Sequence, residues 1–502
     1  MRPVRHLVVL LGLWTSACSD GPVIVGRLHG AAAGSSADAG APPRADADAA
    51  LPLTLPAPAA PGAATARDDD PYRLSIELGA RDAFCRGSGV ALVGVRPGGA
   101  ADCAFHVERR LFSHALCACE TLRLEGESFQ LDSFDSGNAA YQAGQTGSAV
   151  GVNGALARLA DDTQLLGNLS VAGREPLVLS GQRLLVTGDL EVNAGLELNG
   201  GSLRVARDLW LGAETRASAA SLHVERDAYQ TRASPGLVAA DIAGRLSTVD
   251  AFRADTPCAC DGAHTLDIAA LVTAAQRQND DVAAGFDADA LVLAMYGSDL
   301  LQLPCGRLFA SRIELPSLST YIVVALGRTA LFVQGYFKVD AVSTLSLGPS
   351  GSGELDVFVA GDLIVEASST LVLGDRTRPA AMRVFVAGQV RVDGTLALAG
   401  QLYAPNSEVA LPLASADVDQ YGALFARSLR LPTARMHFDR AILQAGPTCT
   451  APAPQRCDGD AQCPDALACT ANRCGACNQD ADCFEPLRCA DRKCQLLVSA
   501  WP

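Results

Sequence analysis

The sequence is poor in aromatic residues, has no excess of basic residues and, after its first twenty residues, contains no apolar run long enough to span a membrane. Aromatic residues make up 5 % of the chain, whereas 47 of its 502 residues are glycine. This balance favours many short strands and turns over long helices. The net charge of −15 excludes the basic surface that nucleic-acid binding requires, so no nucleic-acid partner is expected.

Signatures of common catalytic sites are also missing. The chain contains no H-E-x-x-H, no G-x-S-x-G and no G-x-x-x-x-G-K-[ST] segment. His437 and Asp439 lie close together in "HFDR" and could suggest acid–base chemistry, but a packed, hydrogen-bonded structural pair is the favoured interpretation. We therefore expect no catalytic residues, no metal site and no cofactor.

Cysteine, by contrast, is abundant. The chain has 17 cysteines, mostly in close clusters, which indicates an oxidising compartment. The start, "MRPVRHLVVLLGLWTSACSD", has the positive and apolar regions of a secretory signal. The small residues Ser16 and Ala17 before Cys18 resemble the lipobox of bacterial lipoproteins, although Thr15 departs from it. The resemblance implies that residues 1–18 are a signal peptide and that Cys18 carries the lipid.

An ordinary signal peptide that happens to contain a cysteine is the alternative. Ser19, rather than aspartate, follows the cysteine. The resemblance therefore implies an outer-membrane lipoprotein, exposed at the cell surface, with a periplasm-facing orientation as the alternative. Residues 19–71, rich in Ala, Pro and Asp, have no helical or strand period and are predicted to be a disordered tether.

A nine-residue phrase recurs along the body of the chain. Its apolar residues alternate on both sides of a central Gly or Arg, which predicts two strands joined by a kink. The copies begin at residues 184, 203, 222, 307, 331, 357 and 384, with looser copies at 401 and 423. Strands repeated at this period favour an all-β fold, a right-handed parallel β-helix or solenoid, with a β-sandwich as the alternative. The copies at 331, 357 and 384 are predicted to stack as successive parallel coils.

These patterns divide the chain after the tether into three further regions. Residues 72–160 are expected to form an N-terminal, cysteine-containing cap, and residues 161–448 the β-helix. The phrase is interrupted over 231–303, which we interpret as an inserted loop and helix. The segment "HTLDIAALVTAAQRQ" supplies the amphipathic pattern of that helix.

Two segments carry a resemblance to a known family. "LDSFDSGNAAYQAGQTGSAVGVNGALA" and "GQLYAPNSEVALPLASADVDQYGALFARSLRLPTARMHFDRAIL" resemble the two ends of an uncharacterised bacterial β-helix domain. That domain accompanies some minor pilins and occurs in envelope lipoproteins. The resemblance covers about residues 120–445. It implies the fold and a surface location, and it implies no activity.

The last region, 449–502, contains a tandem duplication. Four cysteines recur twenty residues later, as 457/477, 463/483, 469/489 and 474/494. A unit this small cannot bury a core, so we expect disulfides to replace one. We predict that all eight bond inside the module, although Cys474 and Cys477 also form a C-x2-C typical of zinc sites and the aspartates could suggest calcium. The unit resembles the cysteine-rich repeats akin to the Dickkopf N-terminal region.

Eight cysteines remain outside the signal and this module. "CAC" occurs twice among them, which could indicate a redox or metal pair, but structural disulfides that tie the cap and the insert to the solenoid are favoured. The disulfide candidates outside the module are Cys85, Cys103, Cys117, Cys119, Cys258, Cys260, Cys305 and Cys449. Those inside it are Cys457, Cys463, Cys469, Cys474, Cys477, Cys483, Cys489 and Cys494.

An aspartate follows the kink in four copies of the phrase, at Asp189, Asp208, Asp227 and Asp362. Stacked carboxylates could bind a cation or cleave a glycan. Turn capping, in which each aspartate accepts backbone N–H bonds, is the favoured interpretation. Arg207 and Arg226 precede two of the aspartates and could neutralise the row.

The sequence thus favours a non-enzymatic lipoprotein, a scaffold for adhesion or for interaction with the envelope. Its expected partners are the outer membrane, through the lipid anchor, and a surface protein or glycan. A polysaccharide-degrading enzyme on the same fold and a structural component of a surface filament are the alternatives. A cleft lined by at least two carboxylates with a nearby Arg or Lys would favour the enzyme.

Overall fold

The computed structural model describes most of the chain between residues 73 and 444 and four short strands beyond it. The described residues are 73–77, 79–95, 101–102, 107–138, 140–218, 220–232, 241–261, 265–287, 299–316, 320–348, 353–416, 418–444, 468–470, 473–475, 488–490 and 493–495. The chain divides into two units, Met1–Ala66 and Arg67–Pro502, and all described residues lie in the second. The predicted signal, Cys18 and the tether lie outside them.

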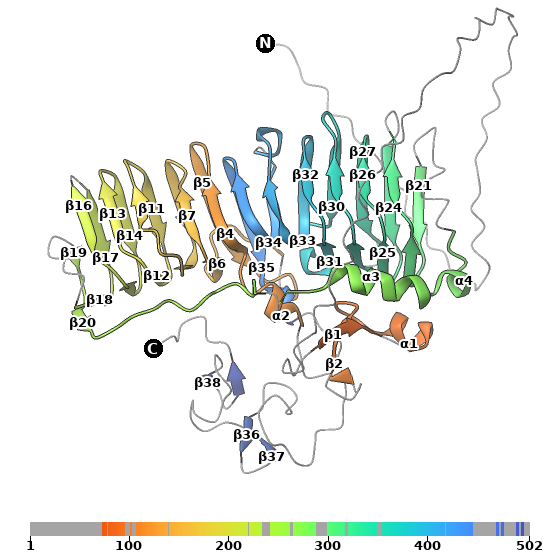
Figure 1. The fold of residues 1–502 in the computed structure, drawn as a ribbon, viewed down its shortest axis with the longest axis horizontal. Coiled ribbons are helices and arrows are strands. Elements are labelled where there is room, and N and C mark those ends of the chain that lie inside the picture. The colour runs from red at the N-terminus through yellow and green to blue at the C-terminus, as the bar shows by residue number, and fades with distance from the viewer. Residues whose placement is uncertain are drawn as a thin grey trace, which may run out of the picture. The chain divides into compact units, whose positions relative to one another are not determined.

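The described residues form mostly β-strands with few helices, and most strands belong to one large sheet (Figure 1). This sheet has 25 strands, its pairings are parallel, and it curls until it is nearly closed. The all-β prediction is therefore confirmed. None of the described helices is long and apolar enough to cross a membrane.

The chain first forms a small antiparallel sheet with two helices and then enters the large sheet. The first group comprises β1 (Arg73–Ile76), α1 (Arg81–Arg86), β2 (Leu92–Val95), β3 (Ala101–Asp102) and α2 (Val107–Leu111). We call the next group the first strand run: β4 (Leu116–Leu124), β5 (Ser128–Phe134), β6 (Ser148–Val152), β7 (Ala155–Arg158), β8 (Asp162–Leu165), β9 (Gly167–Val171), β10 (Leu177–Leu179), β11 (Arg183–Val186), β12 (Leu190–Val192), β13 (Leu196–Asn199), β14 (Ser202–Val205), β15 (Leu209–Leu211), β16 (Thr215–Ser218), β17 (Ser221–Val224), β18 (Ala228–Thr231), β19 (Asp241–Ile242) and β20 (Leu246–Val249).

Two helices then precede a second strand run. The helices are α3 (Ile268–Arg277) and α4 (Asp281–Ala284). The second strand run comprises β21 (Asp299–Leu303), β22 (Gly306–Ala310), β23 (Ile313–Leu315), β24 (Thr320–Ala325), β25 (Arg328–Val333), β26 (Phe337–Val339), β27 (Val342–Leu347), β28 (Glu354–Val359), β29 (Leu363–Val365), β30 (Thr370–Gly374), η2 (Pro379–Ala381), β31 (Met382–Val386), β32 (Val390–Val392), β33 (Thr395–Ala410), η3 (Leu413–Ser415), β34 (Gln420–Leu431), β35 (Ala434–Asp439) and η4 (Arg440–Gln444). Two hairpins follow, β36 (Ala468–Thr470) with β37 (Arg473–Gly475) and β38 (Arg488–Ala490) with β39 (Lys493–Gln495).

Strands of the first run pair in a regular register. Leu184 of β11 pairs with Leu203 of β14, which pairs with Leu222 of β17. These residues open three copies of the repeated phrase. Their side chains are buried, because alternate residues of each strand point into the core while their neighbours point outward. The alternation of apolar residues in the sequence therefore predicts correctly which face of these strands is buried.

In the second run, successive copies of the phrase lie more residues apart, and larger side chains fill the core. Leu331 pairs in parallel with Val357, and Val357 with Val384, so the predicted stacking of these three copies is confirmed. The next residue in each copy is a buried phenylalanine. Phe332 and Phe358 stack with ring centroids 4.8 Å apart, and Phe358 and Phe385 with centroids 4.6 Å apart. The rings thus repeat at the spacing of the strands themselves.

The two runs meet in the interior of the sheet. β34 pairs with β4, and β35 pairs with β5, in parallel. Figure 1 shows these strands, blue and orange, side by side. The large sheet therefore includes β4 to β7, which lie within the region 72–160 that we predicted as the N-terminal cap.

A connecting segment runs back from the end of the first run toward the start of the second. Figure 1 shows it leaving β20, passing along the sheet and entering α3. We call residues 250–261 the strap. The predicted helix of the insert is confirmed as α3, which buries Ile268, Leu271, Val272 and Ala275. The insert also contains β19 and β20, which extend the first run.

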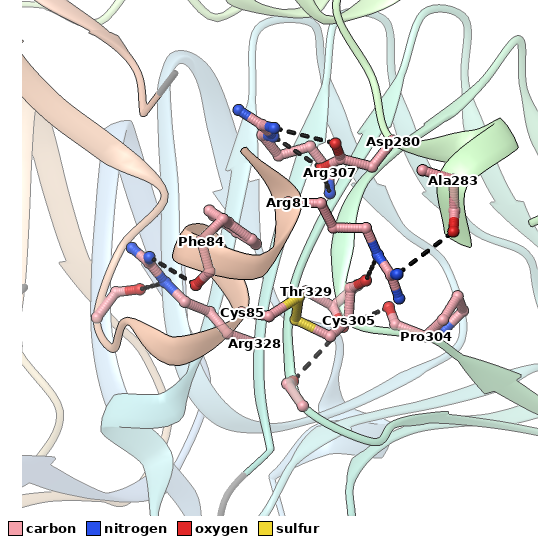
Figure 2. The surroundings of a disulfide bond; sticks show 12 residues. Arg81, Phe84, Cys85, Asp280, Ala283, Pro304, Cys305, Arg307, Arg328 and Thr329 are labelled. Carbon is pink, nitrogen blue, oxygen red and sulfur yellow. Dashed lines mark hydrogen bonds and ion pairs between the residues drawn. A yellow bond between two sulfur atoms is a disulfide. The ribbon is translucent and has the colours of Figure 1, made fainter. Parts of the chain in front are cut away.

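The N-terminal group is fixed to the second run by a disulfide and by a hydrogen bond beside it. Cys85 on α1 is bonded to Cys305, which precedes β22 (Figure 2). Arg81 Nε donates to the carbonyl of Cys305 at 2.8 Å. Nearby, Arg307 Nε donates to Asp280 Oδ2 at 2.8 Å, and both side chains are almost fully buried.

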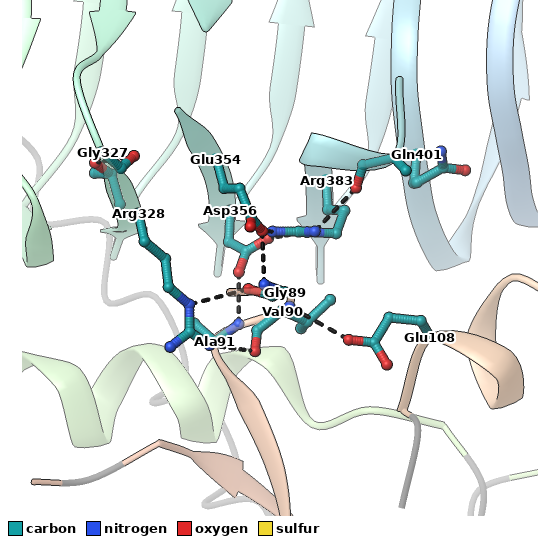
Figure 3. Close-up of polar contacts among 12 residues, drawn as sticks. Gly89, Val90, Ala91, Glu108, Gly327, Arg328, Glu354, Asp356, Arg383 and Gln401 are labelled. Atoms are coloured by element: carbon teal, nitrogen blue, oxygen red, sulfur yellow. Dashed lines mark hydrogen bonds and ion pairs between the residues drawn. The ribbon is translucent and has the colours of Figure 1, made fainter. Parts of the chain in front are cut away.

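A second buried charge cluster holds the same group (Figure 3). Arg383 on β31 forms ion pairs with Asp356 and Glu354 on β28. Asp356 accepts the backbone N–H of Ala91, and Glu354 accepts that of Gly89. Because removal of one partner would leave a buried charge unpaired, these contacts specify how the N-terminal group docks.

Candidate functional site

The row of aspartates forms hydrogen bonds between neighbouring copies of the repeat. Asp189 Oδ1 accepts the backbone N–H of Asp208 at 3.2 Å, and Asp208 Oδ1 accepts that of Asp227 at 3.1 Å. Asp227 Oδ1 accepts the N–H of Arg245 at 2.8 Å. In the second run, Asp362 Oδ1 accepts the N–H of Gln389 at 2.7 Å. This is the geometry expected for capping of the kinks.

The charges of this row are partly neutralised. Arg207 Nε lies 3.4 Å from Asp189, and Arg226 Nε lies 3.5 Å from Asp208. Burial raises the pKa of Asp189, while the N–H of Asp208 and Arg207 act against that rise. In the described part of the chain, no group of three or more His, Cys, Asp or Glu side chains is arranged to hold a metal ion. We therefore interpret the row of aspartates as structural, because each one links its own copy of the repeat to the next.

Among the residues that the structure describes, six cysteines form three disulfides. Besides Cys85–Cys305, Cys117 on β4 bonds to Cys258, and Cys119 on the same strand bonds to Cys260. The two "CAC" segments are thus joined side by side, and the strap is fixed to the first strand of the large sheet.

Other predicted cysteines are described in part or not at all. Cys469 lies opposite Cys474 in one hairpin, and Cys489 lies opposite Cys494 in the other. The two repeats therefore share one backbone arrangement at these positions. The remaining candidates lie outside the described residues: Cys103, Cys449, Cys457, Cys463, Cys477 and Cys483. The closure of the module on itself stays a prediction.

The best candidate for a functional site is an open pocket where the two strand runs meet. Its volume is about 460 Å³, within the range of small-molecule sites. Both runs contribute, because β35 lies against β5 and β5 against β8. The lining residues are Gln130, Leu131, Asp132, Tyr141, Ala143, Gly144, Gln164, Leu166, Asp419, Arg435, Met436 and His437.

A histidine–carboxylate pair lies in this pocket. His437 and Asp132 are direct partners in the β35–β5 register, and His437 Nδ1 lies 2.6 Å from Asp132 Oδ1. Asp132 Oδ2 accepts from the Tyr141 hydroxyl at 2.9 Å and from the Gly144 N–H at 2.8 Å. An ionised carboxylate only accepts hydrogen bonds, so Nδ1 of His437 carries the hydrogen.

The other ring nitrogen of His437 faces a second carboxylate. Nε2 lies 4.0 Å from Asp419 Oδ2, which is too far for a direct hydrogen bond. Asp419 Oδ1 in turn lies 2.9 Å from Arg435 Nε. A hydroxyl group placed between Nε2 and Asp419 could contact both.

Aromatic rings fix the orientation of the imidazole. The ring centroids of Tyr141 and Tyr421 lie 4.4 and 4.7 Å from that of His437. Burial, followed by the contact with Asp132, raises the pKa of Tyr141, so its hydroxyl stays protonated and keeps donating. The pocket thus presents a rigid imidazole, a carboxylate–guanidinium pair and two amide side chains.

The partner of His437 corrects our expectation from the sequence. We predicted a structural pair between His437 and Asp439, but Asp439 instead accepts the N–H and hydroxyl of Ser136 and the N–H of Ala380. The register of β35 with β5 places Asp132 opposite His437. Sequence reasoning missed the pocket, since its members come from segments about 300 residues apart and no local motif marks them.

Comparison with known proteins identifies one matching family model, a domain of unknown function (DUF7305), over residues 263–445. The match covers α3, α4 and the second strand run, and it begins after β20. The pocket therefore combines residues from inside and outside the matched region. No curated protein and no solved structure matches the chain.

Proposed function

We propose that the protein is a non-enzymatic, lipid-anchored scaffold of the cell envelope, which serves adhesion or interaction with other envelope components. The observation that carries this proposal is the set of three disulfides in the described part of the chain. They join cysteines 141 to 220 residues apart in sequence, and such bonds persist in oxidising compartments. The signal-like start and the lipobox-like segment ending at Cys18 agree with this location.

The scaffold in this proposal is a right-handed parallel β-helix. Its support is the pairing pattern of the first run, where β11 pairs with β14, β12 with β15 and β13 with β16. A coil of three strands per turn produces this order, and crossovers between parallel strands are almost always right-handed. The rigid stack would present its outer side chains as one extended surface, held away from the membrane by the tether.

Membrane fractionation tests the anchored scaffold. The wild-type protein is expected in the outer-membrane fraction, and Cys18→Ala is expected to release it, because the thiol is the point of lipid attachment. Ser19→Ala, which changes the neighbouring residue and keeps the cysteine, is the matched control. Equal membrane partition of wild type and Cys18→Ala would reject the lipid anchor.

A glycan-cleaving enzyme is a second candidate, favoured by the pocket alone. Two carboxylates, Asp132 and Asp419, line it together with Arg435. Asp132 already accepts three hydrogen bonds, so Asp419, which pairs with Arg435, and Nε2 of His437 are the groups that would contact a substrate. If the wild type releases reducing ends from a glycan and Asp419→Asn does not, the protein cleaves glycans and does not merely bind them.

A further inference from the structure

The outer face beside the pocket carries a row of four polar side chains and one leucine. In register across β35, β5, β8, β11 and β14 lie Arg435, Gln130, Gln164, Leu185 and Arg204. Each is one strand from the next, at the spacing of about 4.8 Å that parallel strands impose. The row therefore runs across the strands from the pocket into the first strand run.

The surface along this row is hollowed. A second depression of about 290 Å³ is lined by Asp162, Gln164, Arg183, Leu184, Leu185, Ser202 and Arg204. Gln164 lines both this depression and the first pocket. The two depressions are thus neighbours that share Gln164, and we call them together the groove.

Each arginine along the groove has a carboxylate partner. Arg435 pairs with Asp419 at 2.9 Å, and Arg183 lies 3.4 Å from Asp162. Arg204 Nε donates to Glu225 at 2.8 Å. Because each of these cations already has a carboxylate partner, the groove offers no surplus positive charge for a polyanion. It suits an uncharged ligand rich in hydroxyl groups.

The side chains of the groove match the chemistry of sugars. Amide, guanidinium and carboxylate groups are planar and can contact two adjacent hydroxyls at once. Leu166 and Leu185 supply apolar patches for the C–H face of a ring. At the pocket end, Nε2 of His437 and Asp419 are separated by a gap that one hydroxyl can bridge.

We propose that this groove binds an uncharged linear oligosaccharide, with one sugar ring in the pocket beside His437 and the chain laid across β5, β8, β11 and β14. The inference deepens the adhesion role proposed above, on which its biological meaning rests, by naming the class of ligand. Gln164, which lines both depressions, and Gln130, its partner in the β5–β8 register, are its central contacts.

Titration calorimetry with the full-length protein tests this site. The probes are cellohexaose, laminarihexaose and chitohexaose, with hexagalacturonate as the charged counterpart. We expect saturable binding of at least one neutral hexasaccharide and none of hexagalacturonate. Gln130→Leu combined with Gln164→Leu should weaken binding at least tenfold, because both amides lose their hydrogen bonds to the ligand. Gln276→Leu, an exposed glutamine on α3, is the matched control and should bind like the wild type.

The outcomes separate this inference from the anchored scaffold. No saturable binding of the three neutral probes at millimolar concentration, or binding that the double variant leaves unchanged, would overturn the glycan site. Preferred binding of hexagalacturonate would overturn its neutral character. Membrane partition of the same double variant should stay normal, so loss of glycan binding with an intact anchor distinguishes the groove from the anchor.

Discussion

Glu108 on α2 is a carboxyl group in surroundings that penalise its charge. Its side chain is almost fully buried, Oε1 accepts the N–H of Val90 at 3.3 Å, and Oε2 makes no hydrogen bond. Burial raises the pKa of Glu108 to about 7, while hydrogen bonds and nearby Arg383 limit the rise. The folded protein thus holds a proton here that an unfolded chain would release at lower pH.

This raised pKa gives a prediction for stability. Between the unfolded pKa near 4.5 and the folded pKa near 7 the folded state binds more protons, so the free energy of unfolding should fall as pH rises. Glu108→Gln removes the titration and should be more stable than the wild type above pH 7, by roughly 3 kcal/mol at most. Below pH 4.5 the two proteins should unfold alike.

Urea unfolding of both proteins across this pH range measures the difference. Glu175→Gln, at an exposed position, is the control and should follow the wild type. A constant difference between Glu108→Gln and wild type at all pH values would show that the carboxyl does not titrate in this range.

Among the elements, the repeated phrase and the structure agree where pairing is local in sequence. The alternation predicted the buried faces of β11, β14 and β17, and the segment ahead of Arg277 predicted α3. The aspartates after each kink predicted the ladder, since a short carboxylate at a turn reaches the next backbone N–H. Nothing in the phrase indicates that β34 pairs with β4. Because all copies of the phrase have the same pattern, the phrase does not indicate which copy pairs with which where the two runs meet.

Two of the disulfides, Cys117–Cys258 and Cys119–Cys260, bond the strap to β4. Asn153 exchanges two hydrogen bonds with the backbone of Cys258, and Gly151 leaves room for Pro257 and Cys258, where a Cβ would lie 2.9 Å from Pro257. Farther along, Phe252 packs against Trp210, which stacks on Tyr229 with centroids 3.7 Å apart. The strap thus lies against several strands of the first run.

The two bridges of the strap are predicted to act redundantly. Each closes a loop of the same length, with a sequence separation of 141 residues, so one bridge suffices to restrict the unfolded chain. Replacing Cys117 and Cys258 by Ser, or Cys119 and Cys260 by Ser, should each cost about 1 kcal/mol. Replacing all four should cost roughly 4 kcal/mol, because the loop then opens. Urea unfolding measures all three; strictly additive losses would show that the bridges act independently.

At the scale of the molecule, both ends of the large sheet come from the middle of the chain. The first run leads outward from β4 to β20, the strap returns, and the second run leads inward from β21 to β35. The junction of β34 and β35 with β4 and β5 then closes a gap between segments about 300 residues apart. Neither run is complete without the other, since each would leave strand edges unpaired.

This arrangement predicts that the chain can be cut and still assemble. Fragments divided between residues 262 and 263, where the family match begins, separate the first run with its strap from the second run. Co-produced in an oxidising compartment, they should purify together, because the junction strands, the Arg328–Glu77 ion pair at 2.8 Å and the Cys85–Cys305 bridge all cross the cut. Each fragment alone should aggregate through its open edge.

Affinity purification through a tag on one fragment, followed by non-reducing and reducing gels, measures the association. Cys85→Ser with Cys305→Ser is the control, since the fragments should still purify together without the bridge if the junction strands hold them. The size of the pair on a gel-filtration column should equal that of the uncut chain. Two fragments that elute as separate folded monomers would contradict the junction, because neither run would then need the edge that the other supplies.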